Sequence, residues 1–317
     1  MKVYRIIAAA LLVAWLNNAH AQTTGRVVLG FAPGGALDIM SRVVTEALRE
    51  GLNQPFITEN RAGADGRIAI DAVKAAPPDG NTLLFSPIAN FGIFPHTQRN
   101  LPYDPVKDFI PVSMVGAYTI ALAVGPMTPA RTLQEFIAWA KANPKLSNFG
   151  TPGNGNIPHF TGVLLAQAAG IEMNSIVYKG SVPAILDVIG GQLATVFTLL
   201  GDFTTQARAG KLRVLAHSGA QRSSVAPDVP TFKELGYNIE AAGWYGLFAP
   251  AGVPGATVDR IGRLVMQAQQ TPAVRERMQG LSLEIRLTTP AQFAEIVRND
   301  YEFWGKTVRA SGFKAVE

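Results

Sequence analysis

Short apolar runs alternate along the chain with segments whose apolar residues recur at helical spacing. Strands are predicted at the runs and helices at the periodic segments, because side chains repeat their direction every two or every 3.6 residues. The first third of the chain gives a strand at 27–31, a helix that ends at Gly51, a strand at 56–59, a helix at 66–74 and a strand at 82–86. This order is typical of a parallel sheet covered by helices.

The same rhythm restarts after a long apolar run at 112–124, and it predicts a second α/β unit. The expected elements are helices at 133–141, 158–169 and through Leu186, strands at 175–178, near Thr195 and at 212–217, a later strand at 244–249, and helices from Thr257 and Ala291. The sequence therefore predicts two units of similar architecture.

Two apolar runs, at 112–124 and 243–249, flank the middle unit. We expect them to be the crossing strands of a hinge between two lobes. The first lobe would then be discontinuous, with residues 22–118 plus 242–317, and the second lobe would hold residues 119–241.

The N-terminus has the features of a signal peptide. An apolar run at 6–16 follows two basic residues, and the sequence Ala-His-Ala at 19–21 is the small-x-small pattern cleaved by signal peptidase. The run is shorter than the roughly 20 residues that span a membrane. We therefore expect cleavage after Ala21 and a secreted protein, located in a bacterial periplasm because the chain has no cysteine for disulfides.

Charge and composition exclude several classes of function. Removing residues 1–21 takes away Lys2 and Arg5 and no acidic residue, so the formal charge falls from +5 to +3. No basic stripe interleaved with aromatic residues occurs, and we expect no nucleic-acid partner. The absence of cysteine also excludes thiolate catalysis and cysteine-ligated metals.

No motif of an enzyme is present. His96, His159 and His217 are scattered without a metal-ligand spacing, and a packing or hydrogen-bonding role is the simplest interpretation of each. The chain also lacks a Gly-x-Ser-x-Gly nucleophile turn. We therefore expect no catalytic residue, no metal and no cofactor.

A glycine pair, Gly34-Gly35, lies between the first strand and the first helix, and Asp38 follows one helical turn later. The loop lacks the lysine of a phosphate-binding loop and the third glycine of a dinucleotide site. Free N–H groups at a helix N-terminus can hold an anionic oxygen, but glycines also simply form tight turns. Both interpretations stay open from this stretch alone.

Similar glycine-rich loops follow other predicted strands, at 150–156 and 178–181, and a polar loop follows at 86–90. In a parallel sheet the carboxyl ends of strands surround the ligand crevice. Several groups of backbone N–H could therefore converge on a cleft between the lobes.

Taken in order, several stretches resemble the extracytoplasmic solute receptors of tripartite tricarboxylate transporters, the Bug receptors. The stretches are Phe31-Ala32-Pro33-Gly34-Gly35 with Asp38, Glu59-Asn60-Arg61, Pro78-Asp79-Gly80, the run at 101–109, Gly153-Asn154-Gly155 with His159, Tyr178-Lys179-Gly180, the run at 227–231 and Trp244-Tyr245-Gly246-Leu247. The resemblance covers essentially the whole chain after residue 21.

The resemblance implies an α/β, two-lobed periplasmic binding protein of type II-like fold, with a hinge and a ligand cleft between the lobes. It implies a monomer that captures a small organic mono- or dicarboxylate, grips it largely with backbone amides, and delivers it to the membrane components of a transporter. The ligand-binding residues it implies are Phe31, Ala32, Gly34, Gly35, Ser86 and Asn90 in the first lobe, with Asp38 shaping the loop, and Thr151, Asn156, His159, Tyr178, Gly180 and Ser181 in the second.

The chain departs from the family pattern at Thr198, where an aspartate is usual. This argues against a ligand amine that needs a negative charge at that position. Phe31, Phe91 and Phe94 are interpreted either as an apolar wall for an aromatic ligand body or, for the last two, as core residues. Two other functions stay open: a ligand-loaded partner of a membrane sensor, and a periplasmic hydrolase, which lacks an evident nucleophile.

Overall fold

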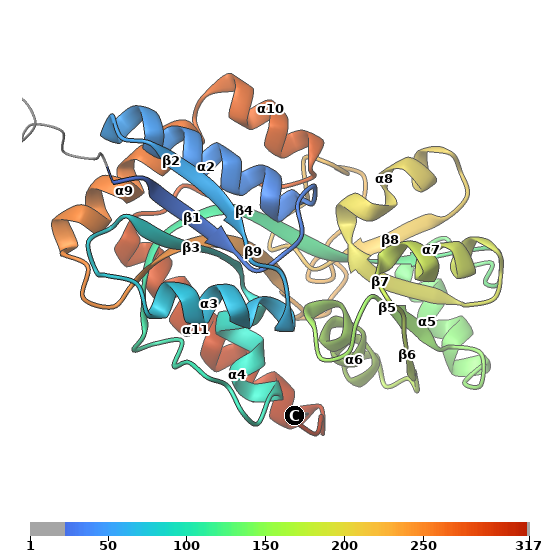
Figure 1. Cartoon of the computed structure of the whole chain (residues 1–317). Helices are drawn as coiled ribbons and strands as arrows, with labels where there is room; N and C mark the ends of the chain where they lie inside the picture. Colours follow the sequence, from blue (N-terminus) through green and yellow to red (C-terminus); the bar gives the residue numbers. More distant parts are fainter. Residues whose placement is uncertain (1–22, 316–317) are drawn as a thin grey trace, which may run out of the picture.

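The computed structural model describes residues 23–315, which form two α/β lobes joined by two long strands (Figure 1). The predicted signal peptide lies outside the described residues. None of the helices within 23–315 combines the length and the apolar character needed to cross a membrane.

The first lobe is built from both ends of the chain. Its N-terminal elements are β1 (Gly25–Leu29), α2 (Ala36–Leu52), β2 (Phe56–Asn60), α3 (Arg67–Lys74), β3 (Thr82–Pro87), α4 (Phe94–Thr97) and β4 (Phe109–Val124), with a 3₁₀ turn at Ala64–Gly66 and a π turn at Ala89–Ile93. Its C-terminal elements are β9 (Ala242–Pro250), α9 (Gly255–Ala268), α10 (Pro272–Gly280) and α11 (Pro290–Ala310).

The second lobe is one continuous segment of chain. It contains α5 (Leu133–Ala142), β5 (Phe149–Thr151), α6 (Ile157–Ala169), β6 (Ser175–Val177), α7 (Ser181–Ile189), β7 (Thr195–Leu199), α8 (Leu200–Arg208) and β8 (Arg213–His217). Strand β5 runs parallel to both β6 and β7, so the carboxyl ends of these three strands share one edge of the sheet.

Alternating side chains build the core on both faces of the first-lobe sheet. Val27 and Leu29 of β1 pack with the buried faces of α2 and α9, whereas Val28 packs on the side of α3 and α11. This alternation follows from the two-residue repeat of a strand. The sheet is thus covered by helices on both faces, as the strand–helix rhythm predicts.

Strands β4 and β9 connect the lobes. β4 pairs antiparallel with β9 from Phe109 to Thr119, and from Ile120 onward it pairs with β7 and, beginning at Ala121, with β8. The hydroxyl of Ser218 donates to the Ala241 carbonyl at 2.7 Å and accepts from the Ile120 N–H at 2.9 Å, so one side chain joins both strands at the crossing. The residue boundaries given above for the lobes stay a prediction.

Three helices, the four-residue α4 and the longer α8 and α10, were not predicted by the hydrophobic pattern. α8 buries only Leu200 and Phe203, and α10 buries only Met278, so neither shows an apolar stripe of several turns. The first strand also begins and ends two residues earlier than predicted, because β1 pairs with β2 from Gly25 to Leu29 and the chain bends at Gly30.

Candidate functional site

The loop between β1 and α2 is fixed from behind by a buried carboxylate. Asp38 Oδ2 accepts the Gly34 N–H at 3.0 Å and Arg42 Nε at 3.1 Å, and Oδ1 accepts Asn60 Nδ2 at 3.0 Å. Burial acts to raise the pKa of Asp38, but the hydrogen bonds from Arg42, Asn60 and Gly34 outweigh it and hold that pKa below its usual value. Asp38 is therefore ionised, and it holds the loop in one conformation.

The outer side of the same loop is open. Gly34 has a φ of +98°, which favours glycine, whereas Gly35 has an ordinary φ of −81° and is the N-cap of α2 without a side-chain cap. A Cβ built on either glycine would meet no atom within 4 Å. The Gly34 N–H is thus occupied by Asp38, while the start of α2 presents N–H groups that no capping side chain covers.

Ser86 and Asn90 are buried and hold the neighbouring loop at 63–66. The Ser86 hydroxyl donates to Asn90 Oδ1 at 3.0 Å, and Asn90 Nδ2 donates to the Asp65 carbonyl at 2.9 Å. The Phe31 ring lies beside Gly66, and Phe31 is 37% exposed. These two polar side chains therefore fix the neighbouring loop, and Phe31 supplies exposed apolar surface next to it.

The second-lobe loop at 151–159 follows β5 and is held by neutral groups. Asn156 Oδ1 accepts the His159 N–H at 3.0 Å, and this hydrogen bond caps α6. The same oxygen accepts the Thr151 hydroxyl at 3.2 Å. His159 Nδ1 accepts the Gly155 N–H at 3.0 Å. Burial lowers the pKa of His159, so its ring is neutral at pH 7 and carries its proton on Nε2.

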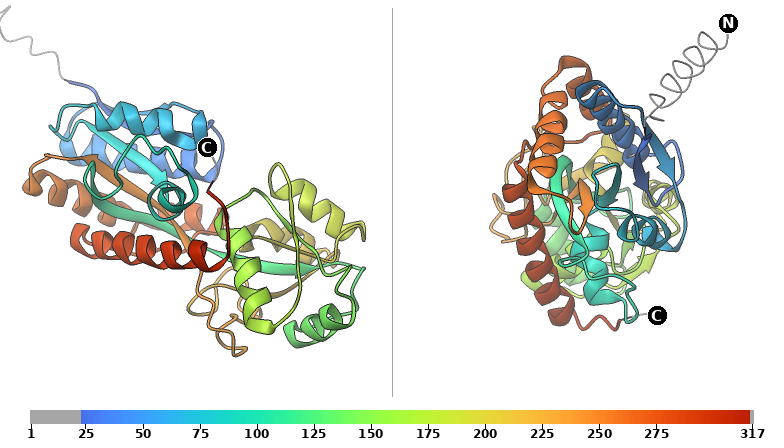
Figure 2. Two further views of the ribbon diagram at one scale, coloured as in Figure 1. Left: turned by 90° about the horizontal axis from the view of Figure 1, so that it is seen from below. Right: turned by 60° about the vertical axis from the view of Figure 1, so that its left-hand side comes forward.

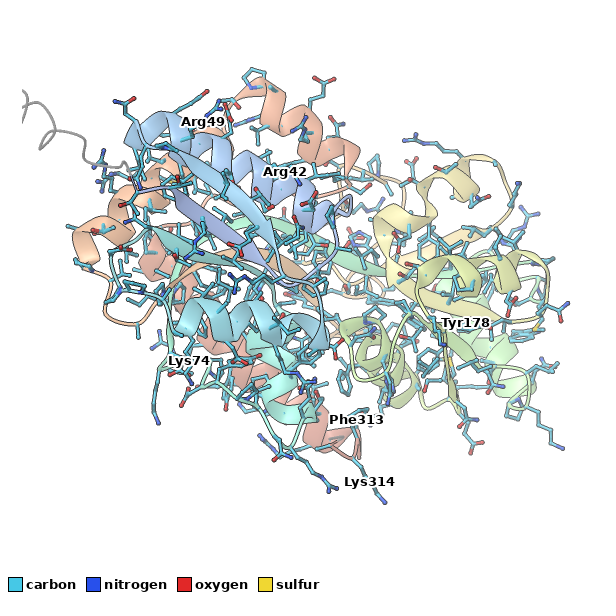
Figure 3. The ribbon with its side chains drawn as sticks, viewed as in Figure 1. Arg42, Arg49, Lys74, Tyr178, Phe313 and Lys314 are labelled. Atoms are coloured by element: carbon cyan, nitrogen blue, oxygen red, sulfur yellow. The ribbon has the colours of Figure 1, made fainter. Side chains whose placement is uncertain are left out.

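The loop at 178–181 follows β6 and leads into α7 (Figure 3). The Tyr178 hydroxyl donates to Asp187 at 2.7 Å, and burial together with that carboxylate raises the pKa of Tyr178 to about 12. Gly180, with a φ of +103°, is the N-cap of α7 and has no side-chain cap, and Ser181 is half-buried in the first turn. Tyr178 is thus neutral and engaged within its own lobe.

An acidic residue that the sequence patterns did not single out lies just after β7. The buried Thr198 hydroxyl donates to Asp202 Oδ2 at 2.7 Å, and Asp202 is exposed in the first turn of α8. Burial, with a contribution from the charge of Asp202, raises the pKa of Tyr245 on β9 to about 12. A negative charge therefore does lie beside Thr198, and the four-residue spacing between the two residues was its only signal in the sequence.

The predicted residues form two groups, one in each lobe. The first group surrounds the carboxyl ends of β1 and β3, and the second surrounds those of β5 and β6, with Thr198 on β7. Figure 1 shows β1 pointing toward the junction with the second lobe.

Two other predicted residues differ in exposure. Ala32 is exposed beside Phe31. Phe91 is fully buried and stacked on Phe248 with ring centroids 3.8 Å apart, so Phe91 belongs to the core.

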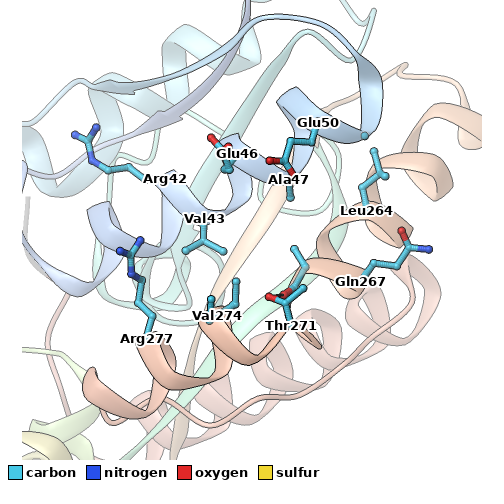
Figure 4. A pocket seen from close by; sticks show the side chains of 13 residues that line it. Arg42, Val43, Glu46, Ala47, Glu50, Leu264, Gln267, Thr271, Val274 and Arg277 are labelled. Carbon is cyan, nitrogen blue, oxygen red and sulfur yellow. Dashed lines mark hydrogen bonds between the residues drawn. The ribbon is translucent and has the colours of Figure 1, made fainter.

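A separate groove of about 820 Å³ lies between α2 and the pair α9 and α10 (Figure 4). Apolar side chains such as Val43, Leu264 and Val274 line it, together with Arg42, Glu46 and Arg277. Arg42 also bonds to Asp38, so it contacts both the groove and the residue that fixes the first-lobe loop.

Among residues 23–315 no cluster of side chains has the composition of a metal site.

Comparison with known proteins identifies the family. The family model described as tripartite tricarboxylate transporter family receptor matches residues 40–313. BugT of Bordetella pertussis is 34% identical over 291 residues, which cover 91% of this chain and 89% of BugT. The chain belongs to the tripartite tricarboxylate transporter receptor family.

Solved structures confirm the predicted α/β binding-protein fold of this receptor. Rpa4515 of R. palustris with adipate is 26% identical with a TM-score of 0.79, over 93% of the receptor and 99% of that chain. MatC (Rpa3494) from Rhodopseudomonas palustris with bound malate is 28% identical with a TM-score of 0.73, over 90% and 98%. Both neighbours hold a dicarboxylate.

Proposed function

We propose that the receptor captures a small organic mono- or dicarboxylate in the periplasm and delivers it to the membrane components of a tripartite transporter. The observation that carries this proposal is the start of α2, where Gly35 leaves the helix N-terminus uncapped and open while Asp38 fixes the loop from behind. A helix N-terminus attracts anionic oxygen through its free N–H groups and its dipole. Adipate and malate in the two neighbours are ligands of this class.

The second lobe contributes donors to the other end of the ligand in this proposal. They are Nε2–H of His159, with its neutral ring, and the uncapped start of α7 at Gly180 and Ser181. A hydrogen bond to a charged group contributes about 1.5–3 kcal/mol, so a few contacts reach the roughly 8 kcal/mol of a micromolar complex. Phe31 would contact an apolar or aromatic body of the ligand, and Asp202 would lie near a cationic group if the ligand has one.

Binding of this kind requires hinge closure and no chemical step. We therefore assign the receptor no catalytic residue and no cofactor, and we expect a monomer exported by cleavage after Ala21. In this function the lobes trap the ligand until the membrane components accept it.

A thermal-shift screen of aliphatic, aromatic and amino carboxylates tests the proposal. A ligand at 100 times its Kd adds about 2.7 kcal/mol of stability, which gives a clear rise in melting temperature. Gly35→Val should abolish that rise while the free protein stays folded and melts only slightly lower, because the backbone at Gly35 tolerates a side chain but valine is a poorer N-cap than glycine. Gly255→Val is the control, since Gly255 is the first residue of α9, lies in open space as Gly35 does, and is outside the two groups of site residues. Binding that survives Gly35→Val would refute the location of the site.

A further inference from the structure

The described residues that follow α11 lie at the junction of the lobes and contact the second lobe. Figure 2 shows α11 running along the first lobe to the junction, where the last described residues lie beside the second lobe. Gly312, with a φ of +71°, turns the chain after α11, and the Phe313 N–H donates to the Ser311 hydroxyl at 3.1 Å. Gln167 of α6 reaches the Ala310 carbonyl at 3.4 Å.

The side chain of Phe313 packs on the second-lobe loop (Figure 3). Its ring lies edge-to-face with the ring of His159, at a centroid distance of 5.8 Å, and with that of Phe160 at 5.6 Å. A Cβ built on Gly155 would lie 2.9 Å from Phe313 Cζ, so the loop backbone passes directly against the ring. Phe313 thus touches both partners of the hydrogen bond from the Gly155 N–H to His159 Nδ1.

We propose that Phe313 is a positioning residue for the ligand loop of the second lobe, holding His159 so that Nε2–H stays directed for a ligand oxygen. The inference rests on the proposed function, because the ligand is what His159 would contact. An aromatic edge restricts the rotation of the imidazole ring, and a donor fixed in advance needs no reordering when the ligand arrives. The first lobe would in this way supply part of the second-lobe site.

The first test needs no ligand. Hydrogen exchange of the amides at 153–159 is measured for wild type, Phe313→Ala and Phe303→Ala. Phe303 is the matched control, since it is a 39% exposed aromatic residue of α11 whose ring packs on Trp304. We expect exchange about tenfold faster in Phe313→Ala only, and restoration by Phe313→Tyr.

Nitrogen NMR of His159 supplies a second readout that a merely structural role would not change. Wild type should show one tautomer, with the proton on Nε2, and Phe313→Ala should show a mixture. Unchanged exchange together with an unchanged tautomer in Phe313→Ala would overturn the inference.

Affinity separates this inference from the proposed function. If wild type binds adipate, malate or another carboxylate of the screen, Phe313→Ala should raise the Kd about tenfold and Phe303→Ala should leave it unchanged. An unchanged Kd for Phe313→Ala overturns the positioning role alone. A wild type that binds no carboxylate refutes the proposed function and the ligand contact of His159, while hydrogen exchange still decides whether Phe313 holds the loop.

Discussion

The two predicted ligand loops are held in place by different physical means. In the first lobe the loop before α2 is fixed by an ionised carboxylate, Asp38, and by its partners Arg42 and Asn60. In the second lobe the loop at 151–159 is fixed by neutral hydrogen bonds and by aromatic packing from Phe313. The first loop should therefore respond to changes of charge, and the second to changes of packing.

The largest expected effect is a pH dependence of the free energy of unfolding that has opposite directions in the two lobes. His217 in the second lobe is fully buried, its Nε2 has no hydrogen-bond partner among the described residues, and burial lowers its pKa to about 4. Between pH 6.5 and 4 this histidine is protonated in the unfolded chain but not in the folded one. The free energy of unfolding is therefore highest above pH 6.5, and it falls by about 3 kcal/mol as the pH is lowered to 4. Urea unfolding at several pH values should show this loss in wild type and a much smaller one in His217→Asn.

The first lobe holds a group with the opposite dependence. Burial raises the pKa of Asp300 to about 6, although Trp244 Nε1 donates to it at 2.7 Å. Here the folded chain binds the extra proton, so stability falls as pH rises from 3.8 to 6. Asp300→Asn should remove that decline and serve as the counterpart of His217→Asn. If the free energy of unfolding depended on pH in the same way in His217→Asn and Asp300→Asn, the opposite contributions of these two residues would be contradicted.

A smaller effect comes from removing the carboxylate of the first loop. Asp38→Ala leaves the Gly34 N–H without its acceptor and removes one of the two acceptors of Asn60 Nδ2, the other being the Phe31 carbonyl. It should lower the free energy of unfolding by about 2 kcal/mol and weaken carboxylate binding. Glu46→Ala is the control, because the Glu46–Arg49 pair is exposed and contributes less than about 1 kcal/mol. Urea unfolding of both variants should rank them clearly, and equal losses would mean that Asp38 is no more than a surface ion pair.

Ligand choice should depend on Asp202 rather than on Thr198 alone. Aspartate and malate differ only in an ammonium and a hydroxyl group, so their affinity ratio reports a nearby negative charge. Asp202→Asn should lower the aspartate-to-malate ratio about tenfold, because it removes a charge-assisted partner for the ammonium. Calorimetric titration measures the ratio, with Asp228→Asn, the same change of charge at an exposed position of the same lobe, as the control. A ratio unaffected by Asp202→Asn would place the ligand away from α8.

The smallest effect on stability should come from Gly35→Ser. A serine at the N-cap of α2 can accept an N–H of the first turn, which adds about 0.3 kcal/mol of stability over glycine. The same hydroxyl occupies a donor that the proposed ligand needs, so affinity should fall while the melting temperature rises slightly. A gain in affinity would show that the carboxylate does not bind at this helix end.

Sequence patterns predicted the α/β architecture, because it follows from apolar periodicities that extend over whole elements. They could not predict α8 or α10, whose buried faces are too short to show a period. They also left both interpretations of the glycine pair open, and the structure gives each glycine a different one: Gly34 serves the turn and bonds to Asp38, while Gly35 leaves the helix end open. Whether that end binds a ligand stays a prediction.

The other features that the sequence did not predict depend on contacts between distant parts of the chain. Phe313 meets His159 only because α11 returns to the junction of the lobes, and Arg42 faces Arg277 across a groove made by helices from opposite ends of the sequence. No local pattern carries such information. Asp202 differs, since its four-residue distance from Thr198 was visible in the sequence, but its meaning required knowing where β7 ends.

The insertion of β9 between β3 and β4 has a consequence for how the receptor is made. Until residues 242–250 have emerged during synthesis or export, the edges of β3 and β4 that β9 will join have no partner strand. Open strand edges promote association with other chains. The partly synthesised receptor is therefore most prone to aggregation just before the last quarter of the chain emerges. A chain ending before Ala242 should be degraded or precipitate rather than accumulate as folded protein.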